Sequence, residues 1–223
     1  MNFVATFLLV CSAIFPMQEQ NASLVHSSPV QPSSMKTIIQ KIDAHLKKNA
    51  PVVYQSLNPP LTAAQIEALE AKYKLKLPTD LKELYLWKNG QNLDDDYKSF
   101  FGNKTFLPLE QALDIRQELN EMLLAKDPEE QFKTPNWWNQ GWIPVFENGG
   151  GDYLCYDSVG IFTNKPGQIL DYYHDEYYRL IYAPGLVLFL EALLRVYDKK
   201  YEDEWDSLKE IGEYPKRYTL KEE

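Results

Sequence analysis

The sequence is poor in the residues that build most metal centres and disulfide frameworks. It contains three histidines and two cysteines among 223 residues. Cys11 lies in an apolar N-terminal run, so cleavage or a later start leaves Cys155 as a single thiol without an internal disulfide partner. A lone cysteine within an apolar stretch is usually a small core residue, not a nucleophile. This cysteine usage fits a reducing compartment and predicts a cytoplasmic protein.

Basic residues are also scarce relative to acidic ones. The chain has 23 Lys and Arg against 32 Asp and Glu, which gives a formal net charge of -9. Such a field repels phosphate backbones and anionic lipid, whereas it accelerates encounters with basic partners. The glycines at 149–151 lack the Lys-Ser/Thr of a phosphate-binding loop, so they predict a hairpin turn. We therefore expect no nucleic-acid ligand and no cofactor.

The sequence has no good candidate for a transmembrane helix. The apolar run at residues 3–15 is too short to cross about 30 Å of hydrocarbon comfortably. It has the length of a secretory signal, but no Lys or Arg precedes it and no clear cleavage site follows. Residues 17–34 have the Ser- and Pro-rich composition of a linker. Residues 1–34 are thus predicted to be an apolar leader and disordered linker, either a true export signal or an upstream misreading before a start at Met35.

The rest of the chain carries clear helical signals. Hydrophobic residues make up 44% of the sequence, enough for a substantial core. Apolar spacing predicts a first helix over residues 35–48, and Thr62 with Gln65 forms a capping box that opens a second. A third helix follows Pro78 and ends at Asn89-Gly90. Proline also marks the start of two later helices, at Pro108 and Pro184.

Short strand patterns lie between these helices. A hairpin is predicted around Gly102-Asn103, and residues 142–147 and 153–157 read as two antiparallel strands joined by the glycine turn. Residues 167–170 and 178–182 supply two more. We therefore predict an α+β fold, a mostly antiparallel sheet with helices packed against it, as a single domain over 35–200. Residues 201–223 are predicted to be a charged C-terminal tail.

Several short motifs occur in an order and spacing that together resemble the SUKH superfamily. They are Leu77-Pro78-x-x-Leu81, Asn89-Gly90, Trp142-Ile143-Pro144, Gly151-Asp152-Tyr153-Leu154-x-x-Asp157 and Gly167-Gln168-Ile169. That superfamily includes the fungal cell-wall-assembly regulator and many bacterial immunity proteins, which neutralise a toxin by binding it. The resemblance implies an α+β fold without catalytic activity. We expect the motif residues to shape the fold and not to touch a ligand: Leu77, Pro78, Gly90, Trp142, Pro144, Gly151, Asp152 and Asp157.

A basic toxin domain is the expected partner, because charge complementarity speeds capture. The contact residues are predicted from charged, irregular segments that should be exposed, and they are Asp94, Asp95, Asp96, Asp171, Asp175 and Glu176. No catalytic or metal-binding residue is predicted in this interpretation.

Two alternatives remain open at the level of sequence. If residues 1–34 are a real signal, the chain is an exported or lipid-anchored binding module, or a cell-wall-related regulator. The third hypothesis is a metal-dependent hydrolase, which requires the sheet to bring together Asp152, Asp157, Asp171 and His174.

Overall fold

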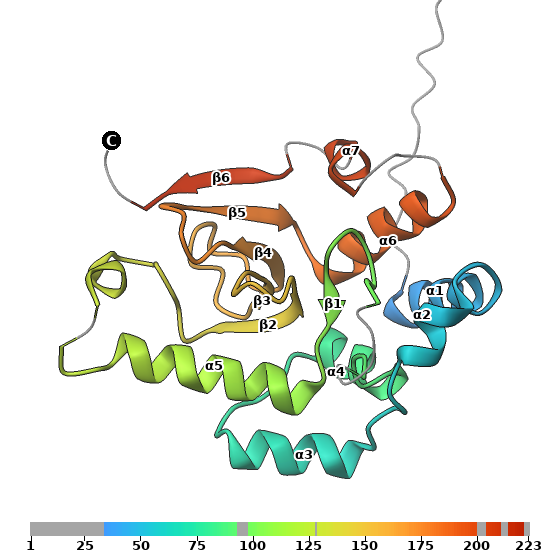
Figure 1. Ribbon diagram of the computed structural model, residues 1–223, viewed down its shortest axis with the longest axis horizontal. Helices are drawn as coiled ribbons and strands as arrows, with labels where there is room; N and C mark the ends of the chain where they lie inside the picture. Colours follow the sequence, from blue (N-terminus) through green and yellow to red (C-terminus); the bar gives the residue numbers. More distant parts are fainter. Residues whose placement is uncertain (1–33, 93–97, 128, 200–203, 211–213, 221–223) are drawn as a thin grey trace, which may run out of the picture. The chain divides into compact units, whose positions relative to one another are not determined.

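A computed structural model describes residues 34–92, 98–127, 129–199, 204–210 and 214–220, and these contain one antiparallel sheet with helices packed against it (Figure 1). The helices are α1 (Met35–Asn49), α2 (Pro51–Ser56), α3 (Ala63–Lys72), α4 (Thr79–Trp87), α5 (Leu109–Leu123), the 3-10 helix η1 (Glu130–Lys133), α6 (Leu186–Tyr197) and α7 (Glu204–Lys209). The strands are β1 (Thr105–Phe106), β2 (Trp142–Glu147), β3 (Tyr153–Asp157), β4 (Gln168–Tyr172), β5 (Tyr178–Ala183) and β6 (Lys216–Thr219). Neighbouring strands pair in the order β1-β2-β3-β4-β5-β6, which confirms the predicted α+β class.

The helix starts follow from capping and proline chemistry. The Thr62 side chain accepts a hydrogen bond from the Gln65 amide at 3.2 Å, and the Gln65 side chain accepts one from the Thr62 amide at 2.9 Å. This pair confirms the predicted capping box and satisfies amide groups that the first turn of α3 leaves free. Pro78 and Pro108 directly precede α4 and α5. No helix among the described residues has both the length and the hydrophobicity needed to span a bilayer.

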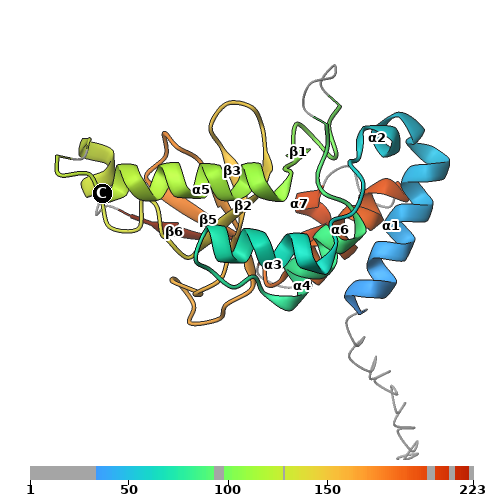
Figure 2. The ribbon, with the colours of Figure 1, turned by 90° about the horizontal axis from the view of Figure 1, so that it is seen from below.

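The larger core lies where α1, α4 and α6 meet one face of the sheet. Figure 2 shows α1, α2, α6 and α7 gathered near one end of the strands, while α5 runs alongside β2. Phe146 of β2 is central, with ring centroids 5.4 Å from Phe106 and 5.7 Å from Phe189 of α6. Such aromatic contacts add to the free energy gained from burying apolar surface.

A second, tryptophan-rich core covers the opposite face of the sheet. Trp138 packs edge-on against Trp142 and Tyr172, with ring centroids 5.5 and 5.3 Å apart. Cys155 is fully buried in this cluster, which confirms its expected role in packing. Burial raises the pKa of its thiol well above the ordinary value, so the reactive thiolate is disfavoured.

One of two local strand predictions differs from the structure. The turn at Gly102-Asn103 is present, since Phe101 and Lys104 form an isolated antiparallel bridge across it, and β1 then pairs with β2. The predicted charged tail is wrong for residues 216–219, which form β6 and pair with β5. Exposed Arg217 and Thr219 alternate with partly buried Lys216 and Tyr218 along this edge strand, and charge at sheet edges discourages unwanted pairing.

Glu70 connects α3 to the start of α4 through a set of hydrogen bonds and ion pairs. Its buried carboxylate accepts a hydrogen bond from the Leu77 amide at 2.7 Å and lies 2.8 Å from Lys82 Nζ and 3.0 Å from Lys76 Nζ. Burial opposes ionisation, but the bonds from Lys82, Leu77 and Lys76 outweigh it and lower the pKa of Glu70 from 4.5 to about 2. Because the folded-state pKa is depressed, the carboxylate stabilises the fold above pH 4.5, and this contribution disappears as the pH falls toward 2.

We expect Glu70→Gln to lower the free energy of unfolding at pH 7 by about 2 kcal/mol, because charge-assisted hydrogen bonds to a buried group are lost. Urea unfolding measured between pH 7 and pH 3 should show a shallower fall in stability for this variant than for the parent. Glu67→Gln, an exposed change in the same helix, should leave the pH profile unchanged. Identical profiles for Glu70→Gln and the parent would contradict this assignment.

Candidate functional site

The glycine turn between β2 and β3 holds Asp152 in a fixed position. Asn148 Oδ1 accepts hydrogen bonds from the Gly150 amide at 2.8 Å and the Asp152 amide at 3.2 Å. Gly151 has a φ of +93°, and a Cβ there would lie 3.5 Å from the His174 ring. That distance is an ordinary van der Waals contact, so glycine is favoured here by the left-handed backbone and not by a lack of space.

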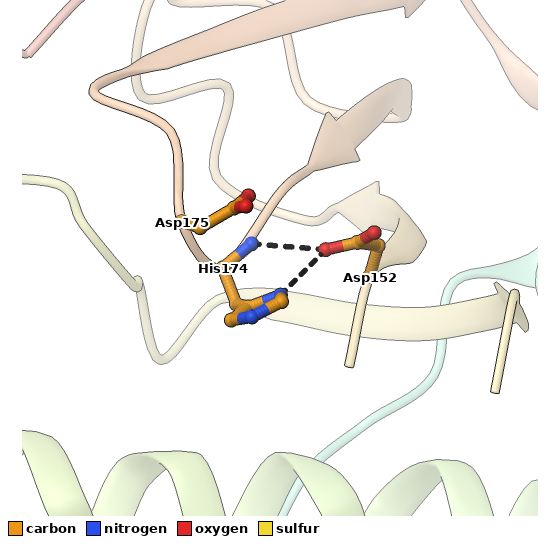
Figure 3. Close-up of side chains that lie close together, drawn as sticks. All are labelled: Asp152, His174 and Asp175. Atoms are coloured by element: carbon orange, nitrogen blue, oxygen red, sulfur yellow. Dashed lines mark hydrogen bonds and ion pairs between the residues drawn. The ribbon is translucent and has the colours of Figure 1, made fainter. Parts of the chain in front are cut away.

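The second component is the turn between β4 and β5, residues 173–177. Its His174 amide donates to Asp152 Oδ1 at 3.1 Å, and His174 Nδ1 lies 2.8 Å from the same oxygen (Figure 3). The other Asp152 oxygen accepts from Asn148 Nδ2 at 2.7 Å. Burial opposes ionisation of Asp152, but the hydrogen bonds from His174 and Asn148 prevail and lower its pKa. Asp152 is therefore a carboxylate at neutral pH.

Exposed acidic side chains complete this region, and we call Asp152, His174, Asp175 and Glu176 the acidic turn site. The last three are exposed, whereas Asp152 is buried beneath them. One ligand atom from each of Asp152, His174 and Asp175 lies within 4.8 Å of the others. Figure 3 shows the two aspartates on either side of the histidine. The arrangement presents negative charge and imidazole to solvent, which suits a cation or a basic side chain.

Arg179 of β5 fixes the position of this turn. The guanidinium is fully buried between the Trp137 and Tyr172 rings, 4.8 and 4.5 Å from their centroids. It donates to the carbonyl oxygens of Tyr173, Glu176, Tyr178 and Trp137 at 3.1, 3.0, 2.5 and 2.6 Å. Sequence reasoning placed Arg179 in a strand but missed this role, for which the signal was a single arginine inside an apolar strand pattern.

Asp171 is a correction to the predicted contact residues, because it is buried and not exposed. It lies in β4, opposite Leu154 of β3 and Leu180 of β5, and retains 3% of its surface exposure. Burial raises its pKa to about 7, although Lys104 opposes that rise. The prediction failed because both faces of this central strand are covered, so the usual alternation of buried and exposed residues does not apply.

The other predicted contacts divide between two regions. Asp175 and Glu176 lie in the exposed turn and remain candidates for partner contact. The residues Asp94, Asp95 and Asp96 lie outside the part of the chain that the structure describes.

The four residues predicted for a hydrolase site do not come together, because Asp157 lies at the opposite end of β3 from Asp152. Asp152 and Asp157 are five positions apart along extended chain, or about 16 Å at roughly 3.3 Å per residue. Asp157 instead caps the following turn, where it accepts from the amides of Val159, Gly160 and Ile161 at 3.0, 2.8 and 3.1 Å. Asp175, which follows His174 in the chain, is the third member of the cluster in place of Asp157 and Asp171.

The remaining motif residues lie in strands and connections away from the acidic turn site. Leu77 is buried, and Pro78 caps α4. Gly90 packs its backbone against residues 107–108. Trp142 and Pro144 lie in β2, where the register with β3 shifts directly after Pro144. That these residues serve the fold and not a ligand stays a prediction.

Comparison with known proteins identifies the family. A search of curated proteins finds no significant match to this chain. The sequence profile described as SMI1 / KNR4 family (SUKH-1) matches residues 60–192, more than half of the chain, from the capping box of α3 to α6. The matched region contains β1 to β5 and the acidic turn site. The chain therefore belongs to the SMI1 / KNR4 family (SUKH-1).

Proposed function

We propose that this protein is a non-enzymatic binding domain that neutralises a basic toxin by capturing it through the acidic turn site. Family membership is consistent with a toxin-immunity or cell-wall-related role. The observation that carries the proposal is an exposed acidic turn, Asp175-Glu176, held in place by hydrogen bonds from the buried Arg179 side chain. A rigid turn loses little conformational entropy on binding, which favours affinity.

The surroundings of the turn support a protein partner. Tyr177 follows the acidic pair with 47% of the residue's surface exposed, and its ring centroid lies 5.5 Å from that of Trp137. An aromatic residue beside charged groups is typical of binding surfaces, since it offers a large apolar area with little flexibility. The net charge of -9 attracts basic proteins over longer distances and speeds encounter at low salt. Asp94, Asp95 and Asp96, a second acidic segment in the sequence, are proposed as further contact residues.

Affinity capture from the source cells tests this proposal. The full chain, an Asp175→Asn/Glu176→Gln variant and an Asp94→Asn/Asp95→Asn/Asp96→Asn variant serve as baits at low salt. A Glu67→Gln/Glu118→Gln variant is the matched control, because it removes two exposed acidic charges from α3 and α5 and leaves residues 173–177 unchanged. Bound proteins are identified and quantified by mass spectrometry.

The full chain and the control are expected to recover a basic protein domain in similar amounts, and the Asp175→Asn/Glu176→Gln variant at least tenfold less. Recovery of no partner contradicts the binding function. Equal recovery by all baits contradicts the assigned surface, because the partner must then contact another face.

A further inference from the structure

The acidic turn site has the composition of a metal-binding site as well as that of a protein contact. Among the described residues, Asp152, His174 and Asp175 are the one group of three His, Cys, Asp or Glu side chains whose ligand atoms converge, all within 4.8 Å. Ligand atoms around one tetrahedral ion lie about 3.3 to 3.6 Å apart, given bond lengths of roughly 2.0 to 2.2 Å. His174 Nδ1 and Asp152 Oδ1 lie 2.8 Å apart, so an ion between them would separate them slightly, and the exposed Asp175 side chain would turn toward them to complete the set.

The supporting contacts resemble those that orient ligands in metal sites. Asn148 Nδ2 and the His174 amide donate to the Asp152 carboxylate, which fixes its plane. The turn that carries His174 and Asp175 is held by Arg179. Hydrogen bonds of this kind restrict ligand motion and increase metal affinity.

A further carboxylate lies behind the cluster. Asp171 is on the same face of the sheet as Asp152, because it pairs with Leu154, two residues along β3. It is 3% exposed, and its Oδ1 has no hydrogen-bond partner among the described residues.

We propose that His174 Nδ1 and the carboxylates of Asp152 and Asp175 bind one divalent transition-metal ion, with water in the remaining positions. One imidazole and two carboxylates form a mixed nitrogen and oxygen donor set, which suits Zn²⁺ and Mn²⁺. The ion replaces the contact between His174 Nδ1 and Asp152 Oδ1, and its charge is balanced by the two aspartates. Metal binding joins the two turns independently of any protein partner.

Isothermal titration of the full chain with zinc chloride tests the site. We expect one ion per chain, with binding at least tenfold weaker in His174→Gln and in Asp175→Asn. His45→Gln is the matched control, because His45 Nδ1 lies 3.5 Å from Asp198 Oδ1 in another imidazole and carboxylate pair, which has no third ligand among the described residues, and it should bind like the parent. Thermal unfolding in metal-free buffer checks that His174→Gln, a change at a side chain 54% exposed, keeps its fold.

Parent-like zinc binding by His174→Gln overturns the proposal. So does loss of binding in a Cys11→Ser/His26→Gln variant with no loss in His174→Gln, because the ion then binds the N-terminal segment. Partner capture repeated in the presence of a chelator separates this inference from the proposed function, since a protein partner retained without metal leaves the binding function intact.

Discussion

Replacing Gly90 with alanine is expected to destabilise the protein by about 3 to 4 kcal/mol. This is among the largest effects expected in this chain from the addition of one methyl group. Gly90 has a φ of +67°, and an added Cβ would lie 2.2 Å from the backbone nitrogen of Pro108 and 2.4 Å from the Leu107 carbonyl carbon. These neighbours are backbone atoms, so no side-chain rotation can relieve the overlap. The Gly90 carbonyl also accepts from the Asn58 amide at 2.9 Å, which links the chain before α3 to the chain before α5.

The matched control for this prediction is Gly149→Ala. Gly149 has a similar φ of +74°, but no atom lies within 4 Å of its added Cβ. Its cost should be limited to the left-handed backbone, about 1 kcal/mol. Urea unfolding of both variants measures the difference, and equal losses would show that close packing at Gly90 contributes nothing.

Arg179→Met is expected to cost about 4 kcal/mol and to loosen the acidic turn site. The substitution keeps most of the side-chain volume but removes the donor that serves four carbonyl oxygens. Buried carbonyls left without a partner carry a desolvation penalty of about 1 to 3 kcal/mol each where water cannot reach them. The stacking of the guanidinium between Trp137 and Tyr172 is lost as well.

Arg217→Met is the control for Arg179, because Arg217 also lies over an aromatic ring, 4.0 Å from the Tyr178 centroid, but its side chain is exposed on β6. We expect a loss of no more than about 1 kcal/mol there. Stability by urea unfolding and hydrogen exchange of residues 173–177 should both change in Arg179→Met. A variant within 1 kcal/mol of the parent, with the turn equally protected, would contradict the positioning role of Arg179.

The sequence predicted the elements whose local signals agree with their final environment. The capping box at Thr62 and Gln65 and the prolines before α4 and α5 act within one turn of the chain, so they need no knowledge of the tertiary fold. The ordered motifs that resemble the SUKH superfamily were confirmed by the family match over residues 60–192. Cys155 was correctly assigned to the core, because its apolar neighbours already determine its burial.

The errors concern residues whose environment depends on distant parts of the chain. Asp171 is buried because β4 is covered on both faces, which a polar residue at a strand end does not reveal. β6 joins the sheet through pairing with β5, although its own sequence is charged. The acidic turn site forms because β3 and β4 pair in a register that brings two turns together, and strand register depends on pairing across the sheet.

Growth of cells that produce the captured partner, with and without this protein, tests the central claim most directly. Neutralisation by binding predicts that the partner alone arrests growth, that the full chain restores it, and that Asp175→Asn/Glu176→Gln protects less than the Glu67→Gln/Glu118→Gln control. If the partner does not arrest growth, or if the full chain binds it without restoring growth, the protein is not its immunity factor.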